Sequence, residues 1–137
     1  MIWTFVVKLG GFRAGDTWSA TIEIDAESTL EDLHFAIQNA VGFDNDHLYE
    51  FFISRTERSA DRVRFNDENE DLYNITLESI YPLGKGKKFY YMFDYGDSWL
   101  FQITKSRNSP MEPNKSMKYP RMVGESGIKP EQYPAWE

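Results

Sequence analysis

The sequence predicts an α+β domain that has a β-grasp-like mixed sheet, one main helix packed on that sheet, and an irregular, proline-rich C-terminal tail. Two alternating apolar runs open the chain, a run with a 3.6-residue apolar period follows, and further alternating runs come after it. This order is that of a β-grasp, although other α+β sheets share it. The chain has 137 residues, 41% of them hydrophobic, so we expect one domain with a continuous core over 1–137.

The first hairpin is predicted from period-2 alternation. One face of Ile2–Leu9 and one face of Thr17–Ile24 are apolar, which is typical of half-buried strands. The connection Gly10–Asp16 contains three glycines and is longer than a two-residue turn, so we expect a loop or a bulge there.

The main helix is predicted over Thr29–Val41. Ser28 and Glu31 have the spacing of a capping box, and Gly42 stands where a glycine commonly ends a helix. One apolar stripe along this segment should face the sheet, and it comprises Leu30, Leu33, Ile37, Ala40 and Val41.

Shorter elements fill the middle of the chain. Leu48–Ser54 and Arg62–Phe65 are predicted strands, Asp67–Asp71 is an acidic turn, and Leu77–Ile80 is a short helical turn. In residues 107–137 the pattern dissolves and five of the six prolines occur, which predicts an irregular tail.

The aromatic segment Phe89–Lys105 is predicted to form a tight hairpin. Gly96-Asp97 has the glycine-first form of a two-residue type II′ turn, which would pair Tyr95 with Ser98. The resulting strands are apolar on both faces, so the second face is either covered or a binding surface. The candidate binding residues are Tyr90, Tyr95, Trp99 and Phe101.

Charge is distributed unevenly along the chain, whose net charge is −7. Up to Tyr81 there are 16 acidic and six basic residues, whereas the remainder has six acidic and nine basic residues. Overall acidity disfavours non-specific binding to nucleic acid, but the basic and aromatic second part leaves that possibility open.

Composition also bounds the compartment and the chemistry. The chain has no cysteine, which excludes a disulfide framework, a thiolate zinc site and a cysteine nucleophile. It shows no secretory signal and no apolar run of bilayer length, so we expect a cytoplasmic protein without a membrane partner. Phosphate-loop and dinucleotide fingerprints are missing from the sequence as well, and we expect no cofactor.

A few polar residues are candidates for chemistry. Asp94 and Asp97 flank the predicted turn and, with His47 or Asp46, could build a carboxylate and imidazole site for a divalent metal or for acid/base work. Aspartate is common in turns because its side chain bonds the local backbone, so the structural role is favoured over the catalytic and metal-binding ones.

Four segments together resemble the Ri-plasmid ORF-three-like family, whose members are often labelled insertion-element passenger (TnpR-family) proteins. They are TLEDLH from Thr29, FDNDHL from Phe43, FDYGDSW from Phe93, and Tyr119-Pro120 followed by Gly124. The resemblance implies an α+β, β-grasp-like domain found on plasmids and in bacterial genomes, and it implies no established activity.

Two positions depart from this family. The family often has a histidine where this chain has Phe101, and a Pro-Pro-Glu-Asp run where this chain has KPEQ from Lys129.

These observations favour an accessory or binding module that meets a protein partner through the aromatic sheet face and the tail. One alternative is a metal-assisted enzyme that uses Asp94, Asp97 and His47. Another is single-stranded nucleic-acid binding through the basic, aromatic second part. Convergence of the three polar residues in one cleft would favour the enzyme.

Overall fold

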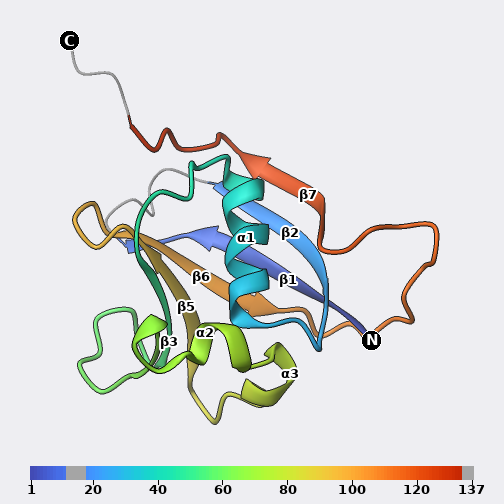
Figure 1. The fold of residues 1–137 in the computed structure, drawn as a ribbon, viewed down its shortest axis with the longest axis horizontal. Helices are drawn as coiled ribbons and strands as arrows, with labels where there is room; N and C mark the ends of the chain where they lie inside the picture. Colours follow the sequence, from blue (N-terminus) through green and yellow to red (C-terminus); the bar gives the residue numbers. More distant parts are fainter. Residues whose placement is uncertain (12–17, 134–137) are drawn as a thin grey trace.

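Residues 1–11 and 18–133 are described by the computed structural model, shown in Figure 1. The elements are β1 (Ile2–Leu9), β2 (Trp18–Asp25), α1 (Leu30–Val41), β3 (Tyr49–Ser54), β4 (Val63–Phe65), the 3₁₀ turn η2 (Asp67–Asn69), α2 (Asp71–Asn74), α3 (Leu77–Ile80), β5 (Lys88–Phe93), β6 (Trp99–Lys105) and β7 (Arg121–Gly127). The predicted loop or bulge in Gly10–Asp16 lies largely outside the described residues. None of the helices in these two ranges is long and apolar enough to span a membrane.

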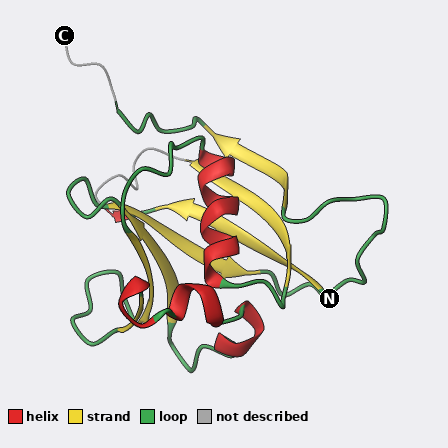
Figure 2. Cartoon of the chain, in the orientation of Figure 1, coloured by secondary structure: helices red, strands yellow, loops and turns green. Residues whose placement is uncertain are grey.

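The strands form one seven-stranded sheet in the order β4-β3-β5-β6-β1-β2-β7, and α1 lies across one of its faces (Figures 1 and 2). An α+β fold with one main helix on the sheet is therefore confirmed. The prediction of a mixed sheet is wrong, since each described strand pair is antiparallel. The helix α1 connects β2 to β3, and these two strands are not neighbours in the sheet, because β1, β6 and β5 lie between them. The helix therefore does not join a pair of neighbouring parallel strands.

The first hairpin and the helix follow the sequence pattern closely. Phe5 pairs with Ile22, and the alternating apolar residues of β1 and β2 point toward α1. The capping box is made by Thr29 and Asp32, one residue later than the Ser28–Glu31 pair we expected. Gly42 ends the helix at φ 78°, a left-handed conformation that glycine adopts without a steric cost.

The core lies between α1 and the sheet. It joins the helix stripe to both hairpins in one buried cluster, whose larger members include Phe5, Trp18, Ile22, Leu30, Leu33, Ile37, Phe51, Phe89, Tyr91 and Phe101. Burial of this much aromatic and aliphatic surface is the main stabilising term of the fold.

The aromatic hairpin has a register one residue away from the predicted one. Phe93 pairs with Trp99, and the five residues between them form the connection in place of a two-residue turn. The Asp94 carboxylate causes this, because its Oδ1 accepts hydrogen bonds from the backbone N–H groups of Gly96 (3.2 Å) and Asp97 (3.3 Å). The positive φ values fall on Asp94 (61°) and Ser98 (53°), not on Gly96, so the type II′ turn is wrong.

This shift has a large consequence for side chains. A slip of one residue moves a whole strand's residues to the opposite face of the sheet. Trp99, Phe101 and Ile103 therefore lie on the α1 face, in the core. A smaller cluster of Phe52, Tyr90 and Leu100 occupies the other face.

The tail is more regular than predicted. Arg121–Gly127 forms β7, which pairs with β2 at the edge of the sheet. Its side chains are mostly exposed, so the strand leaves no apolar alternation in the sequence. Backbone hydrogen bonds hold it to β2, together with the Arg121–Glu23 ion pair and the Trp18–Glu125 hydrogen bond. The prediction of an irregular tail over 107–137 is wrong for this segment.

Candidate functional site

A pocket of about 240 Å³ opens between α1, the loop before β3, and the η2–α2 region. Its lining residues are Glu31, His34 and Phe35 from α1, Asn45, His47 and Leu48 from the loop, Tyr49 from β3, and Asp67, Leu72 and Tyr73 from η2 and α2. Large side chains at the pocket are exposed: Phe35 by 44%, Leu48 by 60% and Tyr73 by 50%. Apolar groups therefore reach solvent next to a concave surface.

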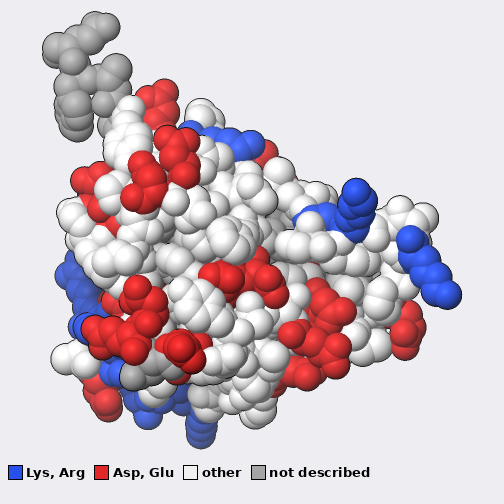
Figure 3. Space-filling model, in the orientation of Figure 1, with Lys and Arg blue, Asp and Glu red and all other residues white. Residues whose placement is uncertain are grey.

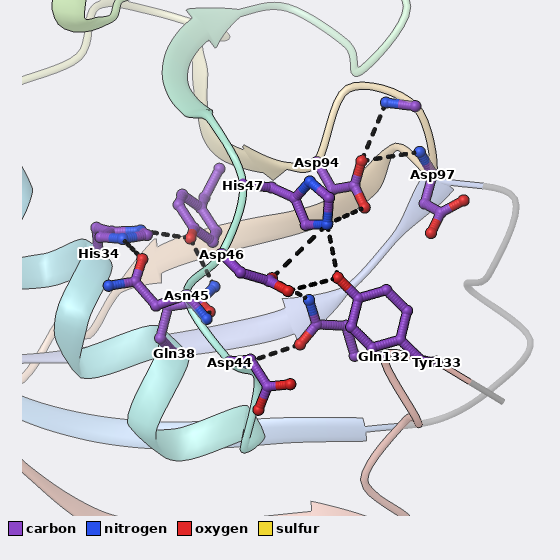
Figure 4. Close-up of polar contacts among 12 residues, drawn as sticks. His34, Gln38, Asp44, Asn45, Asp46, His47, Asp94, Asp97, Gln132 and Tyr133 are labelled. Atoms are coloured by element: carbon purple, nitrogen blue, oxygen red, sulfur yellow. Dashed lines mark hydrogen bonds and ion pairs between the residues drawn. The ribbon is translucent and has the colours of Figure 1, made fainter.

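A closed ring of hydrogen bonds supports one wall of the pocket, to which its members His34 and Asn45 belong (Figure 4). Gln38 Nε2 donates to the Tyr91 hydroxyl (2.9 Å), which lies 2.6 Å from His34 Nδ1. His34 Nε2 lies 2.5 Å from Asn45 Oδ1, and the Asn45 backbone N–H donates to Gln38 Oε1 (3.0 Å). The ring is complete when Tyr91 donates to Nδ1 and Nε2–H donates to Asn45, which assigns the neutral Nε2–H tautomer to His34.

His34 is held neutral and rigid. Burial lowers its pKa to about 4, and the hydrogen bond to Asn45 opposes this only in part. Its imidazole stacks on the Tyr49 ring with a centroid distance of 3.5 Å and an interplanar angle of 1°. The wall is thus preorganised and carries no charge at neutral pH.

The formal charge at the pocket comes from carboxylates. Glu31 and Asp67 line it from α1 and η2, and none of the described lining residues is Lys or Arg. Burial, with further contributions from Glu31, Tyr73 and Asp67, raises the pKa of Tyr49. Figure 3 shows the same bias, with acidic side chains gathered over α2 and the nearby end of α1 and with basic ones at the periphery.

A second polar group, which we call the His47 cluster, consists of Asp46, His47, Asp94, Gln132 and Tyr133 (Figure 4). His47 Nε2 lies 3.3 Å from Asp94 Oδ2, 3.7 Å from Asp46 Oδ1 and 2.6 Å from the Tyr133 hydroxyl. Tyr133 donates to Asp46 Oδ2 (2.7 Å), and Gln132 Nε2 donates to Asp46 Oδ1 (2.8 Å). The cluster ties the C-terminal segment to the loop before β3.

Of the four polar candidates predicted from the sequence, three meet in the structure and one does not. Asp46, His47 and Asp94 lie together, but the Asp97 carboxylate is directed away from His47 (Figure 4). Within the described ranges, no group of three or more His, Cys, Asp or Glu side chains is arranged to hold a metal ion. The convergence of Asp94, Asp97 and His47 that would favour a metal-assisted enzyme is therefore not found for Asp97.

The predicted aromatic binding surface is also corrected. Trp99 and Phe101 are 4% and 0% exposed, because the register shift turns them into the core. Tyr90 is buried against Phe52 on the opposite face of the sheet. Tyr95 alone of the four candidates is exposed, and its hydroxyl donates to the Tyr49 carbonyl.

Sequence reasoning missed the pocket and the partners of His47 in the C-terminal segment. The pocket residues come from three separated segments. Two of these include the family-like runs TLEDLH and FDNDHL, but neither run by itself indicates a binding site. Gln132 and Tyr133 lie more than 80 residues after Asp46. A further signal is the concentration of acidic residues up to Tyr81, which does not by itself point to a particular site.

Two known proteins resemble the chain over much of its length. It is 32% identical over 81 residues to "Uncharacterized protein y4hQ" of Sinorhizobium fredii. The aligned segment covers 59% of this chain and 42% of that protein. The chain thus spans less than half the length of this curated relative. A solved structure, "Protein of Unknown Function MM3350" from Methanosarcina mazei Go1, has the same fold, with a TM-score of 0.72 and 20% identity over 90% of this chain and 68% of the other.

The family comparison covers nearly all of the chain. Residues 4–133 match the model described as "Plasmid pRiA4b ORF-3-like protein". That range includes the pocket and the His47 cluster. Since the match extends from β1 to the end of the described C-terminal segment, this protein belongs to the plasmid pRiA4b ORF-3-like family.

Proposed function

We propose that this protein is a binding module that receives a side chain of a partner protein in the pocket between α1 and α2. The observation that carries this proposal is a concave site with a rigid, hydrogen-bonded wall and exposed apolar groups around it. Exposed apolar side chains that gather at one place on the surface mark sites of protein interaction or ligand binding.

The size of the pocket supports a side chain as the occupant. Its volume of about 240 Å³ lies below the range of roughly 300–1,000 Å³ that is common for small-molecule and cofactor sites. A single side chain with an adjacent peptide backbone fits such a site better than a nucleotide does. Phe35, Leu48 and Tyr73 would then pack against the flanking residues of the partner.

An accessory role on plasmids or other mobile elements, including insertion elements, belongs to this proposal. The name of the family supports it. We also propose a cytoplasmic location, since a chain without cysteine suits a reducing compartment.

The two alternatives have weaker support. A metal-assisted enzyme would use Asp94, Asp97 and His47, and only the first and last of these are close to each other. Single-strand binding would need stacking surfaces at Trp99 and Phe101, both of which are buried.

A displayed peptide library, selected on the purified protein, tests the proposal. We expect peptides whose binding weakens at least tenfold in Leu48→Ser and Tyr73→Ala, because both changes remove exposed apolar surface at the pocket. Ile128→Ser is the control, since this residue is exposed and does not line the pocket. Recovery of no peptide, or equal binding by all three variants, would refute the proposed site.

A further inference from the structure

We infer that the side chain received by this pocket is cationic, an arginine or a lysine presented by a basic segment of a partner protein. This inference rests on the proposed function and adds the chemical class of the ligand. It depends on two carboxylates, on the aromatic rings beside them and on the absence of a counter-ion from the described part of the chain.

Two carboxylates reach the pocket from different elements. Glu31 belongs to α1 and Asp67 to η2, so they lie on separate walls rather than in one local acidic turn. Among the described residues, no ion pair involves either of them. A cation that enters between them would therefore gain two attractive interactions without displacing an internal basic partner.

Aromatic rings supply the rest of the surface. Tyr49 and Tyr73 line the pocket, and Phe35 is exposed beside it. Ring faces attract arginine and lysine through their quadrupoles, most strongly where water is excluded. The alkyl stem of either side chain would cover apolar surface while its charged end meets the carboxylates.

The electrostatic potential in the pocket favours a cationic side chain. Glu31 and Asp67 both help to raise the pKa of Tyr49, which means that they disfavour a negative charge at that ring. The same field favours a positive charge there. His34 is neutral at pH 7 and does not oppose it.

The wider surface would assist association. Acidic residues outnumber basic ones by 16 to six up to Tyr81, the part of the chain that forms the pocket. Figure 3 shows acidic side chains over α2 and the nearby end of α1. Such a surface attracts a basic partner before contact and repels an acidic one.

Matched small probes test the inference directly. N-acetyl-arginine amide and N-acetyl-citrulline amide have nearly the same size and differ in charge. Binding is followed by NMR shift changes of Tyr73 and Leu48 at low salt, where screening is weak. We expect the arginine probe to bind at least tenfold more tightly, and Glu31→Gln and Asp67→Asn each to weaken it severalfold without affecting the citrulline probe.

Glu112→Gln is the matched control, because it changes the net charge equally and lies outside the pocket. Equal binding of both probes, or equal weakening by all three variants, would overturn the cationic inference. If the selected library peptides still required Leu48 and Tyr73 in that case, the proposed function would stand. If the parent protein self-associates and Glu31→Gln abolishes that self-association, the occupant is a second copy of the chain. This result would overturn the inference of a separate partner.

Discussion

Acidification should destabilise this protein through His34. The imidazole is buried within the ring of hydrogen bonds to Tyr91 and Asn45, and its folded pKa is lowered to about 4 from the ordinary value of 6.5. Protonation of Nδ1 would place a second N–H against a hydroxyl that already accepts a bond from Gln38. The folded state therefore resists the proton that the unfolded chain takes up.

The sign and size of the effect follow from this difference. A depressed folded pKa means that the unfolded state binds more protons, so stability is fully present above about pH 6.5 and is lost as the pH falls toward 4. One pH unit corresponds to about 1.4 kcal/mol per proton within this window. From pH 7 to pH 5, His34 alone should lower the free energy of unfolding by about 2 kcal/mol.

Denaturant melts at pH 7 and pH 5 measure this loss in the parent and in His34→Gln. The variant cannot titrate at position 34, so its loss of stability should be smaller by about 2 kcal/mol, whatever its stability at pH 7. An NMR titration of the His34 ring checks the same point. Equal pH dependence in both proteins, or a His34 midpoint near 6.5, would refute the reasoning.

Three further perturbations test the core, the helix end and the His47 cluster. Leu33→Ala should cost about 2–5 kcal/mol in denaturant melts, because the residue is fully buried, and a loss below about 1 kcal/mol would contradict its place in the core. Gly42→Ala should lower the free energy of unfolding by about 1 kcal/mol, because alanine is strained at φ 78°. Gly96→Ala should leave it nearly unchanged, since the new Cβ would lie 3.4 Å from Asp94 Oδ1, an ordinary contact. Equal losses of stability in the two variants would contradict this difference. The hydrogen bond to Asp46 raises the pKa of Tyr133 to about 12, so Asp46→Asn should lower it toward 10 in an ultraviolet titration with Tyr133→Phe as the reference.

Periodicity predicted those parts of the fold whose side chains alternate between core and solvent. β1, β2 and α1 have this property, and the helix ends at the glycine that the pattern indicates. β7 lacks this alternation, since its side chains are mostly exposed and it is held to β2 by backbone bonds and polar side-chain contacts. A sequence pattern cannot report an interaction that leaves side chains in solvent.

The register of the aromatic hairpin could not be predicted from the sequence for a different reason. Gly96-Asp97 favours a two-residue turn, but Asp94 offers the local backbone a better acceptor and closes a longer loop. The resulting shift of one residue in register then decided which aromatic side chains face the core. The predicted aromatic binding surface was wrong for this reason, since the shift buries Trp99 and Phe101.

The His47 cluster and the pocket differ in how much of each could be predicted from the sequence. Asp94 and His47 were grouped from their residue types alone, and the structure brings them together because the end of β5 pairs with the start of β3. The pocket could not be predicted, because Glu31 and Asp67 reach it from α1 and η2, two elements far apart in the chain. Only the packing of η2 and α2 beside α1 brings these residues together (Figure 1).

Asp94 connects these observations and allows a final prediction. Its backbone has φ 61°, its Oδ1 accepts two backbone hydrogen bonds, and its Oδ2 lies 3.3 Å from His47 Nε2. Asp94→Ala removes both loop bonds, at about 1 kcal/mol each, and leaves an unfavourable left-handed residue, so we expect a loss of about 2–3 kcal/mol in denaturant melts. Asp94→Asn keeps an acceptor and tolerates this conformation, so its loss should stay near 1 kcal/mol or below. If the two variants were equally unstable, the charge that Asp94 presents to His47 would matter more than its loop bonds, and those bonds could not be what sets the hairpin register.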